Sequence, residues 1–447
     1  MVGGGGVIRW FYSVAMVALQ PWVRRKLRRR AEAEPRYGMA IDQRFGAYTD
    51  ADPMPAPNTS QVAPLRIWLH AVSLGESRAA VILLASLRAR FPGMQLLLTH
   101  GTATGWEQGQ MALQAGDMQV WQPWDTPKAV DAFLRRFQPT LGLLLETEVW
   151  PNWVVGCRSL GVPLYLVNAR LSPKSLQNSQ RLAWLAGPAF SGLSGVWAQT
   201  AADAERLKQL GAPLRGVTGN LKFDAQPDAG QLACAARWRL QGSRPVVVFA
   251  SSREGEEQMF LDALAGLSPV QRQRVQWLVV PRHPQRFDSV AALILSAGMA
   301  VSRRRDWSDA PPMADLWLGD SLGEMALYYG LADVALLGGS FAPLGGQNLI
   351  EAAACGCPVM LGPHTFNFAQ ASEQAVAHGA AQRCASLAAA VAAALDVVAD
   401  AAALSAMRTH ALEWSRAHRG AANRTVDALV GAEPQIFSAA SPVRQGG

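Results

Sequence analysis

The segment "LRIWLHAVSLGESRAAVILLASLRARF" (65–91) contains the two patterns that decide the fold of this chain. It begins with a continuous apolar run, which is typical of a strand buried on both faces of a sheet. It continues with a stretch that places Leu83, Leu84 and Leu87 on one face of a helix. A buried strand followed directly by such a helix predicts a parallel α/β unit.

The same alternation recurs along most of the chain. Strand-like runs lie at 65–73, 94–101, 118–124, 140–148, 162–170 and 195–200, and again at 246–252, 275–284, 314–320, 332–340 and 357–363. The pattern breaks between them at 225–243. We therefore expect two doubly wound α/β domains in tandem, with ligands bound beyond the carboxyl ends of the strands, in a cleft that both domains face.

These patterns divide the chain into four parts. We expect an N-terminal domain over 31–225 and a C-terminal domain, ending in an Ala-rich helical stretch, over 226–430. Residues 1–30 precede the first domain, and 431–447 read as a disordered tail.

Composition limits the partners. The 447 residues carry a formal net charge of +7, with a sequence pI near 9.4. This excess favours anionic partners such as nucleic acid, a membrane surface or a phosphorylated substrate. The five cysteines are scattered in a pattern that forms neither a disulfide framework nor a zinc motif, which indicates a reducing cytosolic setting.

The N-terminus predicts attachment to a membrane. Residues 7–23, "VIRWFYSVAMVALQPWV", are mostly apolar and run directly into "RRKLRRR" (24–30). A spanning helix needs about 20 apolar residues, so a short span and an amphipathic helix lying in the interface both remain open. Basic residues after the apolar run would keep the following domains on the cytoplasmic side.

Two copies of the tetrapeptide Ser-Leu-Gly-Glu follow strand-like runs, and they end at Glu76 and Glu324. One interpretation is a capping box, in which the serine and the glutamate satisfy free N–H groups at a helix N-terminus. The other is that these carboxylates act at the ligand-binding edge of each sheet. Both interpretations expect a capped helix after each copy.

Further polar residues follow other strand-like runs. Glu146 and Glu148 come directly after one buried run, and two carboxylates there are costly unless they are paired or functional. Glu148 has a simpler alternative role at the start of the next helix. Lys222 lies near the domain boundary, where a cation can meet a phosphate, although most lysines are solvated surface charges.

The second half carries a glycine-rich segment that predicts an anion site. Glycines 338, 339, 345 and 346 lead toward a helix expected to begin near Asn348, so that backbone N–H groups can receive an anion. Neither a Walker A motif nor the dinucleotide fingerprint is present. Glu351, one turn into that helix, is placed to accept hydrogen bonds from ribose hydroxyls.

Taken in order, these segments resemble the motifs of the bacterial 3-deoxy-D-manno-octulosonate (Kdo) transferases, over residues 8–370. The matching stretches are "HAVSLGE", "ETEVWPN", "NARLS", "GNLKFD", "REGEE", "PRHPQRF", "GDSLGEM", "GGQNLIEAAACGCPV" and "GPHTFNF". Two positions depart from the family pattern: Gln347 and Arg253 each stand where the family usually has histidine. These departures leave the class intact and allow small differences in donor contacts.

The resemblance implies a GT-B glycosyltransferase with two Rossmann-like domains and an N-terminal membrane-anchoring helix. It would move Kdo from CMP-Kdo to the lipid A precursor with inversion and without a metal or other cofactor. The implied catalytic residues are Glu76 as the base, with Glu146 and Lys222 stabilising the transition state. The implied CMP-binding residues are Pro281, Arg282, Leu322, Gly323, Glu324, Asn348, Leu349, Ile350 and Glu351.

The implied partners are CMP-Kdo, the lipid A precursor and membrane lipids, at the cytoplasmic side of the bacterial inner membrane. A sugar-nucleotide epimerase of the same fold is the alternative enzyme, and it would not need residues 7–30. A nucleic-acid binder is disfavoured because the dense basic cluster is confined to 24–30 and is not interleaved with aromatics along one face.

Overall fold

A computed structural model of the chain describes residues 4–50, 52–54, 64–242 and 244–440. The chain folds as two compact units. The first comprises Met1–Asp224 together with Gly420–Gly447, and the second comprises Ala225–Arg419. Each unit is built on one parallel sheet, so the prediction of two tandem α/β domains is confirmed.

The sheet of the first unit has seven strands in the order β3-β2-β1-β4-β5-β6-β7. All neighbouring strands are parallel. The strands are β1 (Arg66–His70), β2 (Gln95–His100), β3 (Met118–Trp121), β4 (Leu141–Leu145), β5 (Leu164–Ala169), β6 (Gly195–Ala198) and β7 (Leu214–Val217). The order reverses between β1 and β4, which is where doubly wound sheets bind their ligands.

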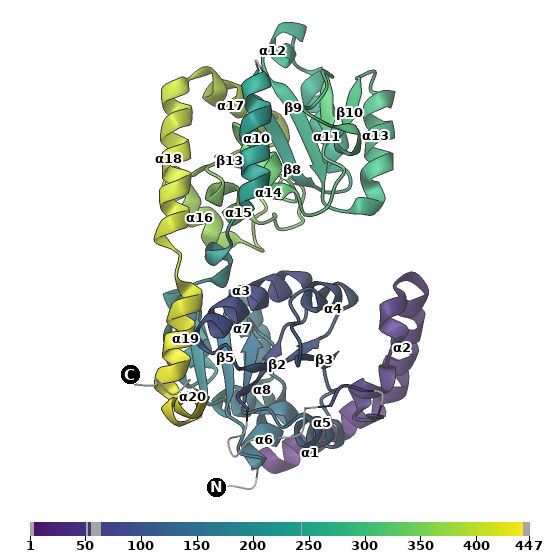
Figure 1. The fold of residues 1–447 in the computed structure, drawn as a ribbon, viewed down its shortest axis with the longest axis vertical. Helices are drawn as coiled ribbons and strands as arrows, with labels where there is room; N and C mark the ends of the chain where they lie inside the picture. The colour runs from purple at the N-terminus through teal and green to yellow at the C-terminus, as the bar shows by residue number, and fades with distance from the viewer. Residues whose placement is uncertain (1–3, 51, 55–63, 243, 441–447) are drawn as a thin grey trace, which may run out of the picture. The chain divides into compact units, whose positions relative to one another are not determined.

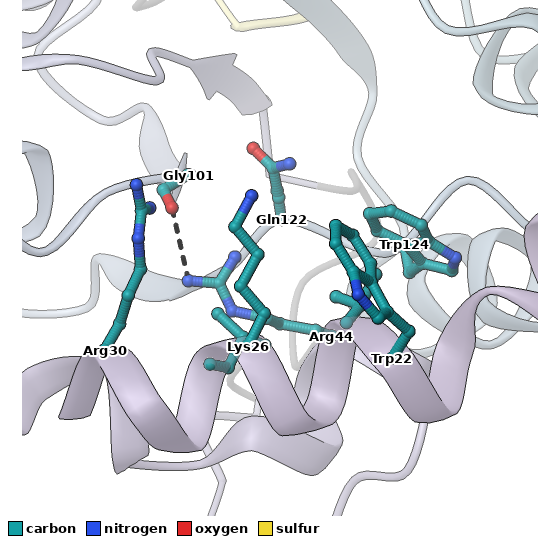
Figure 2. A pocket seen from close by; sticks show the side chains of 9 residues that line it. Trp22, Lys26, Arg30, Arg44, Gly101, Gln122 and Trp124 are labelled. Carbon is teal, nitrogen blue, oxygen red and sulfur yellow. Dashed lines mark hydrogen bonds between the residues drawn. The ribbon is translucent and has the colours of Figure 1, made fainter. Parts of the chain in front are cut away.

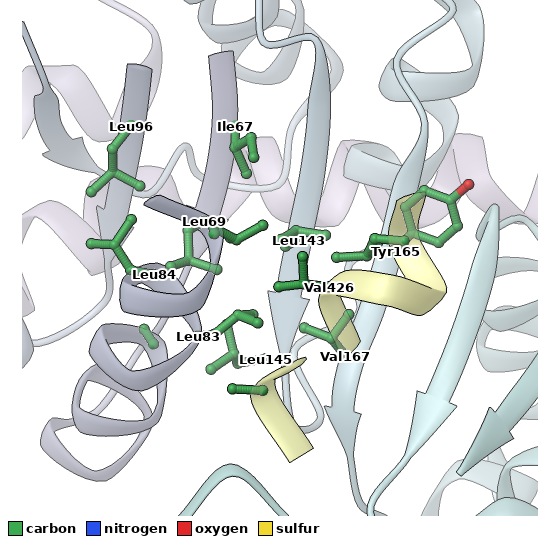
Figure 3. Packing of buried hydrophobic residues seen from close by; sticks show 14 of the residues in the cluster. Ile67, Leu69, Leu83, Leu84, Leu96, Leu143, Leu145, Tyr165, Val167 and Val426 are labelled. Atoms are coloured by element: carbon green, nitrogen blue, oxygen red, sulfur yellow. The ribbon is translucent and has the colours of Figure 1, made fainter. Parts of the chain in front are cut away.

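Helices cover both faces of this sheet (Figure 1). They are α3 (Leu74–Arg90), α4 (Ala103–Gln110), α5 (Pro127–Phe137), α6 (Pro151–Ser159), α7 (Pro173–Arg181), α8 (Ala183–Ser191), α9 (Ala201–Gln209), α19 (Ala421–Ala432) and α20 (Pro434–Ala440). Because successive side chains of a strand point to opposite faces, Ile67 and Leu69 pack in one core while Trp68 packs in the other. The first of these cores is drawn in Figure 3.

The sheet of the second unit has seven parallel strands in the order β10-β11-β9-β8-β12-β13-β14. They are β8 (Val246–Ser252), β9 (Gln276–Pro281), β10 (Val301–Arg303), β11 (Leu316–Leu318), β12 (Val334–Leu337), β13 (Val359–Leu361) and β14 (Ala381–Arg383). Its order reverses between β8 and β12, so the segments after these two strands meet at the corresponding edge.

The helices of the second unit are α10 (Ala229–Gln241), α11 (Glu256–Ala265), α12 (Pro269–Gln273), α13 (Phe287–Ser296), α14 (Met325–Leu331), α15 (Leu349–Ala354), α16 (Ala369–Ala377), α17 (Leu387–Ala399) and α18 (Ala401–Ala417). The segments before α11, α14 and α15 carry polar residues at the carboxyl edge of this sheet.

The C-terminal boundary predicted from the sequence is wrong. Residues 420–430 belong to the first unit, where α19 packs against α3. In Figure 3, Val426 of α19 lies among side chains of α3 and the central strands. The predicted disordered tail (431–447) is also wrong for its described part, since 431–432 end α19 and 434–440 form α20, with Phe437 buried in the same core. Its remaining part, 441–447, lies outside the described residues.

The N-terminal segment forms two helices, α1 (Gly4–Ala18) and α2 (Gln20–Ala33). No single helix in the described part of the chain is long and apolar enough to cross a membrane, although the bent pair Leu387–Ala399 and Ala401–Ala432 meets the criteria together. The two short 3-10 helices Pro35–Gly38 (η1) and Ile41–Phe45 (η2) follow α2 and pack with it around Leu27.

Candidate active site

The strand-order reversal in the first unit brings together the two acidic segments that the sequence singles out. Glu76 lies in the first turn of α3, directly after β1. Glu146 follows the last residue of β4, and β1 and β4 are hydrogen-bonded neighbours. Both carboxylates therefore lie at the carboxyl edge of the sheet, next to the reversal.

Glu76 is both a capping residue and a partly desolvated acid. Ser73 caps α3 by accepting a hydrogen bond from the Glu76 backbone N–H at 3.3 Å, and the Val72 N–H donates to Glu76 Oε2 at 2.8 Å. The serine cap is thus confirmed for this copy, but the Glu76 carboxylate accepts from the Val72 N–H and not from that of the cap residue Ser73, so the capping box is not complete. Burial raises the pKa of Glu76 to about 7, and the nearby charges of Glu146 and Glu148 also raise it. A base with a pKa near 7 is well matched to accept a proton at neutral pH.

Glu146 is held as an anion. It is buried, it adopts a left-handed backbone conformation with φ of 60°, and it forms two ion pairs. Lys222 Nζ lies 2.9 Å from Oε1, and Arg170 Nε lies 2.7 Å from Oε2. Burial alone would raise the pKa of Glu146, but the charges of Lys222 and Arg170 outweigh it and lower the pKa.

Long-range contacts fix the position of Lys222. It lies on the 3-10 helix Leu221–Asp224 (η3), whose Leu221 N–H donates to Asn168 Oδ1 at 3.1 Å. The carboxylate of Asp224 accepts a hydrogen bond from the Ala422 N–H at 2.6 Å, at the start of α19. The returning C-terminal helix therefore supports both η3, which carries Lys222, and α3, which carries Glu76.

The structure adds Arg170 and Glu148 to this group. Arg170 directly follows the last residue of β5, and its ion pair with Glu146 places it in the site. Glu148 accepts a hydrogen bond from Trp150 Nε1 at 3.0 Å, and burial raises its pKa. One acid poised near neutrality beside a second acid held ionised by two cations is an arrangement suited to proton transfer and charge stabilisation.

The second Ser-Leu-Gly-Glu copy is built differently. Helix α14 begins after Glu324 without a side-chain cap, so the expectation of a capped helix is wrong here. The carboxylate of Glu324 instead pairs with Arg304 at 2.7 Å and accepts a hydrogen bond from Ser321. Leu322 is 71% exposed and Gly323 has φ of 79°, so this loop reaches the surface while the Arg304–Glu324 pair is half-buried beneath it.

The glycine-rich loop after β12 already holds an internal anion. The fully buried Glu256 accepts hydrogen bonds from the N–H groups of Gly339 at 2.6 Å, Phe341 at 3.2 Å and Ala342 at 3.2 Å. The predicted anion cradle is therefore occupied by this carboxylate over 339–342. The sequence did not reveal this, although Glu256 opens a helix after β8, the strand that neighbours β12.

The segment 348–351 begins α15 and offers two kinds of group. Asn348 caps the helix by accepting from the Ile350 N–H at 3.2 Å, and its amide donates to Glu351 Oε1 at 3.0 Å. The side chains of Leu349 and Ile350 are buried in the hydrophobic core. Any ligand contact of these two residues would therefore use their backbone.

Cations gather at the carboxyl ends of β8 and β9. Pro281 ends β9, and the Arg282 N–H donates to the carbonyl oxygen of Ser252 at 2.9 Å. Burial lowers the pKa of His283, and the positive charges of Arg253, Arg282 and Arg286 lower it further. Arg253, one of the two departures from the family pattern, thus adds a permanent charge to a surface that suits a phosphate.

No metal site is apparent in the part of the chain that the structure describes. There, no group of three or more His, Cys, Asp or Glu side chains is arranged to hold a metal ion. The carboxylates of Glu146 and Glu324 are instead bound by arginine or lysine side chains.

Comparison with known proteins identifies the family. A family model described as 3-deoxy-D-manno-octulosonic-acid transferase (kdotransferase) matches residues 39–225. The 3-deoxy-D-manno-octulosonic acid transferase of Bordetella pertussis is 45% identical over 433 residues, which cover 94% of this chain and 98% of that protein.

Solved structures match the two-unit architecture. A glycosyltransferase from Rickettsia africae has a TM-score of 0.55 at 12% identity, covering 84% of this chain and 99% of that one. The UDP-GlcNAc 2-epimerase of Neisseria meningitidis has a TM-score of 0.56 at 12% identity, covering 82% of this chain and 100% of that one. A transferase and an epimerase are equally similar, so these likenesses show the fold alone.

Proposed function

The chain belongs to the 3-deoxy-D-manno-octulosonic acid transferase family, and we propose that it transfers Kdo from CMP-Kdo to a lipid A precursor. The family assignment makes it a glycosyltransferase of lipopolysaccharide synthesis, as the motif series predicted, and it disfavours the epimerase alternative. The observation that supports this enzyme class is the 45% identity to the Bordetella pertussis transferase over nearly the whole chain.

The proposed chemistry is one inverting displacement. Glu76, with its pKa near 7, takes the proton from the attacking acceptor hydroxyl as the new bond to the anomeric carbon of Kdo forms. The bond from that carbon to the phosphate oxygen breaks, and CMP leaves with the electron pair. Positive charge that builds on the Kdo ring is offset by a carboxylate that stays ionised, which is the state in which Lys222 and Arg170 hold Glu146.

The donor is assigned to the second unit. CMP carries a phosphate, and the guanidinium groups of Arg253 and Arg282 provide cationic partners around His283, whereas that of Arg286 is paired with Glu257 at 2.7 Å. The Arg304–Glu324 pair and the capped start of α15 at Asn348 offer further polar contacts. Of these residues, Arg282, Glu324 and Asn348 belong to the CMP-binding set that the resemblance implies.

The exposed side chains of α1 support a location of the protein at a membrane surface. Its polar side chains face the first unit: Tyr12 donates to Asp125 at 2.8 Å, and Ser13 donates to Asn152 at 3.1 Å. Its apolar side chains point outward, with Trp10 at 59% exposed and Phe11 at 62% exposed. A helix that exposes its apolar face, followed by basic residues, is suited to lie in the interface of an anionic membrane, here the cytoplasmic side of the inner membrane.

A single assay tests the proposal. The full-length protein is incubated with CMP-Kdo and a lipid A precursor in the presence of EDTA, and the products are analysed by mass spectrometry. We expect the acceptor to gain the mass of Kdo and CMP to be released, and the mass gain also counts the Kdo units added. Failure to modify the acceptor while a UDP-sugar is epimerised would favour the alternative enzyme.

A further inference from the structure

A cavity of about 200 Å³ lies between α2 and the segments that follow β2 and β3. In Figure 2, Lys26 and Arg30 rise from α2 toward Arg44, and Trp22 and Trp124 form one wall. Gly101 and Gln122, which directly follow β2 and β3, complete the opposite side. None of the catalytic or CMP-binding residues discussed above lines this cavity.

The cavity is cationic and incompletely satisfied. Its lining contains three cations, Lys26, Arg30 and Arg44, and no carboxylate. Arg44 is only 6% exposed; its Nη2 donates to the Gly101 carbonyl oxygen at 3.3 Å, while its Nε has no hydrogen-bond partner among the described residues. Burial lowers the pKa of Arg44 to about 10. A buried guanidinium next to two further cations, with no carboxylate in the lining, is costly, and an anion bound among the three cations would offset that cost.

The arrangement of Arg44 suits a phosphate in particular. Its guanidinium stacks on the Trp121 ring, 3.8 Å from the ring centroid, which fixes the plane of its donors. A planar donor fork flanked by two flexible cations matches the several oxygens of a phosphate monoester. Gln122 adds a neutral polar side chain to the lining beside these cations.

The position of the cavity connects it to lipid. Trp124 Nε1 donates to the Met16 carbonyl oxygen at 2.9 Å, so the cavity wall is tied to α1. Trp22, which lines the cavity, is itself 60% exposed, and it follows α1 closely in the chain. Tryptophan favours the membrane–water interface, the depth at which headgroup phosphates lie.

The cavity also lies at the same edge of the sheet as Glu76. Strands β2 and β3 are one and two places from β1 in the sheet. At about 4.8 Å per strand, the lateral offset from β1 is roughly 5–10 Å. A phosphorylated sugar headgroup can span this offset with a hydroxyl near Glu76.

We propose that this cavity binds a phosphate monoester carried by a lipid headgroup. The proposal rests on the proposed function in that the phosphorylated lipid acceptor is one source of such a group. An anionic phospholipid of the membrane is the other source of the same chemistry. Either ligand would orient the first unit on the membrane with its carboxyl edge toward the lipid headgroups.

The test uses two double variants of the full-length protein. Lys26→Gln with Arg30→Gln removes two charges that line the cavity. Arg25→Gln with Arg29→Gln removes two exposed charges from the same helix that do not line it. Both variants change the net charge equally, so general attraction to an anionic surface is matched and only the cavity differs.

Two measurements separate the lipid sources. Flotation with phosphatidylcholine vesicles, with and without phosphatidic acid, measures binding to a phospholipid monoester. Acceptor KM in detergent, for acceptor before and after phosphatase treatment, measures binding to the acceptor phosphate. Wild-type turnover in the same assay tests the transferase function separately, and melting curves check that each variant is folded.

We expect the Lys26→Gln/Arg30→Gln variant to bind phosphatidic acid vesicles or the acceptor about tenfold or more weakly than the Arg25→Gln/Arg29→Gln variant. The reason is that charge-assisted contacts to the phosphate are lost. A loss in KM that disappears for the dephosphorylated acceptor assigns the cavity to the acceptor. A loss confined to phosphatidic acid vesicles assigns it to a phospholipid. Equal behaviour of the two double variants in both measurements overturns the proposal.

Discussion

Replacing Glu76 by glutamine tests the assignment of the base most directly. The amide keeps the shape of the carboxyl group, its oxygen can still accept from the Val72 N–H, and its nitrogen can face Ser73 Oγ. The capping of α3 should therefore survive, within about 1 kcal/mol. The side chain can no longer take a proton, so sugar transfer should be abolished while CMP-Kdo still binds.

The pKa of Glu76 predicts an effect on stability as well. Burial raises this pKa from the ordinary 4.5 to about 7, so the folded state favours the protonated acid. Below pH 4.5 Glu76 is protonated in both the folded and the unfolded state, so it does not lower the free energy of unfolding. As the pH rises through 7, the folded protein must ionise a buried carboxyl group, and the free energy of unfolding falls. At 1.36 kcal/mol per pKa unit, the ionised carboxylate costs the folded protein at most roughly 3 kcal/mol at pH 8. Glutamine has no such cost.

Melting temperatures at several pH values measure this difference. We expect Glu76→Gln to melt a few degrees above the wild type at pH 8, with the advantage shrinking toward pH 4.5. Wild-type kcat/KM should fall below about pH 7 as the base is protonated.

A matched control is Glu148→Gln, which removes a neighbouring like charge. It should retain transfer and move the acid limb of the pH–rate profile to lower pH. Transfer by Glu76→Gln at the wild-type rate would show that Glu76 only caps the helix. A stability difference that is independent of pH would contradict the burial argument.

Four further changes test other parts of the structure. Lys222→Met should lower single-turnover rates roughly a hundredfold or more, with a smaller change in donor affinity; a near-normal rate would reduce this residue to a surface cation. Glu324→Gln, which leaves Arg304 without its carboxylate partner, should raise the donor KM more than it lowers kcat in steady-state kinetics, whereas an unchanged KM would remove it from the donor site. Leu429→Ala should lower the free energy of unfolding by about 2–5 kcal/mol in denaturant titrations, since this side chain of α19 is fully buried in the first unit. Removing residues 1–30 should abolish vesicle binding that resists high salt while calorimetry with CMP-Kdo stays unchanged, and loss of donor binding would contradict the division of roles.

The sequence alone determined the architecture and the places where chemistry could occur. The central strands β1 and β4 are buried along their whole length because they are covered on both faces. Their apolar runs, Ile67–Leu69 in β1 and all of β4, are visible in one sequence. The polar residues that end such runs, including Glu76 and Glu146, had to lie at the carboxyl edge of a parallel sheet. The first strand–helix unit alone was therefore enough to place Glu76.

Three strands were not predicted, and all of them lie at sheet edges. They are β7, β10 and β14, and their residues are mostly exposed or half-buried. An edge strand lacks a neighbour on one side and can be short and polar. Its apolar pattern is then too weak to distinguish it from a loop.

Only the tertiary structure decided which partners the residues have. The apolar face of α19 predicts that it is buried, but the pattern does not say whether the first or the second unit buries it. Likewise, the same tetrapeptide caps α3 at Glu76 and pairs with Arg304 at Glu324, and Glu256 fills a loop more than 80 residues away in the chain. Capping and periodicity act within a few residues, whereas burial and charge pairing depend on neighbours that the folded chain brings together from distant positions. The ionised state of Glu146 follows from this, since its partner Lys222 lies 76 residues further along the chain.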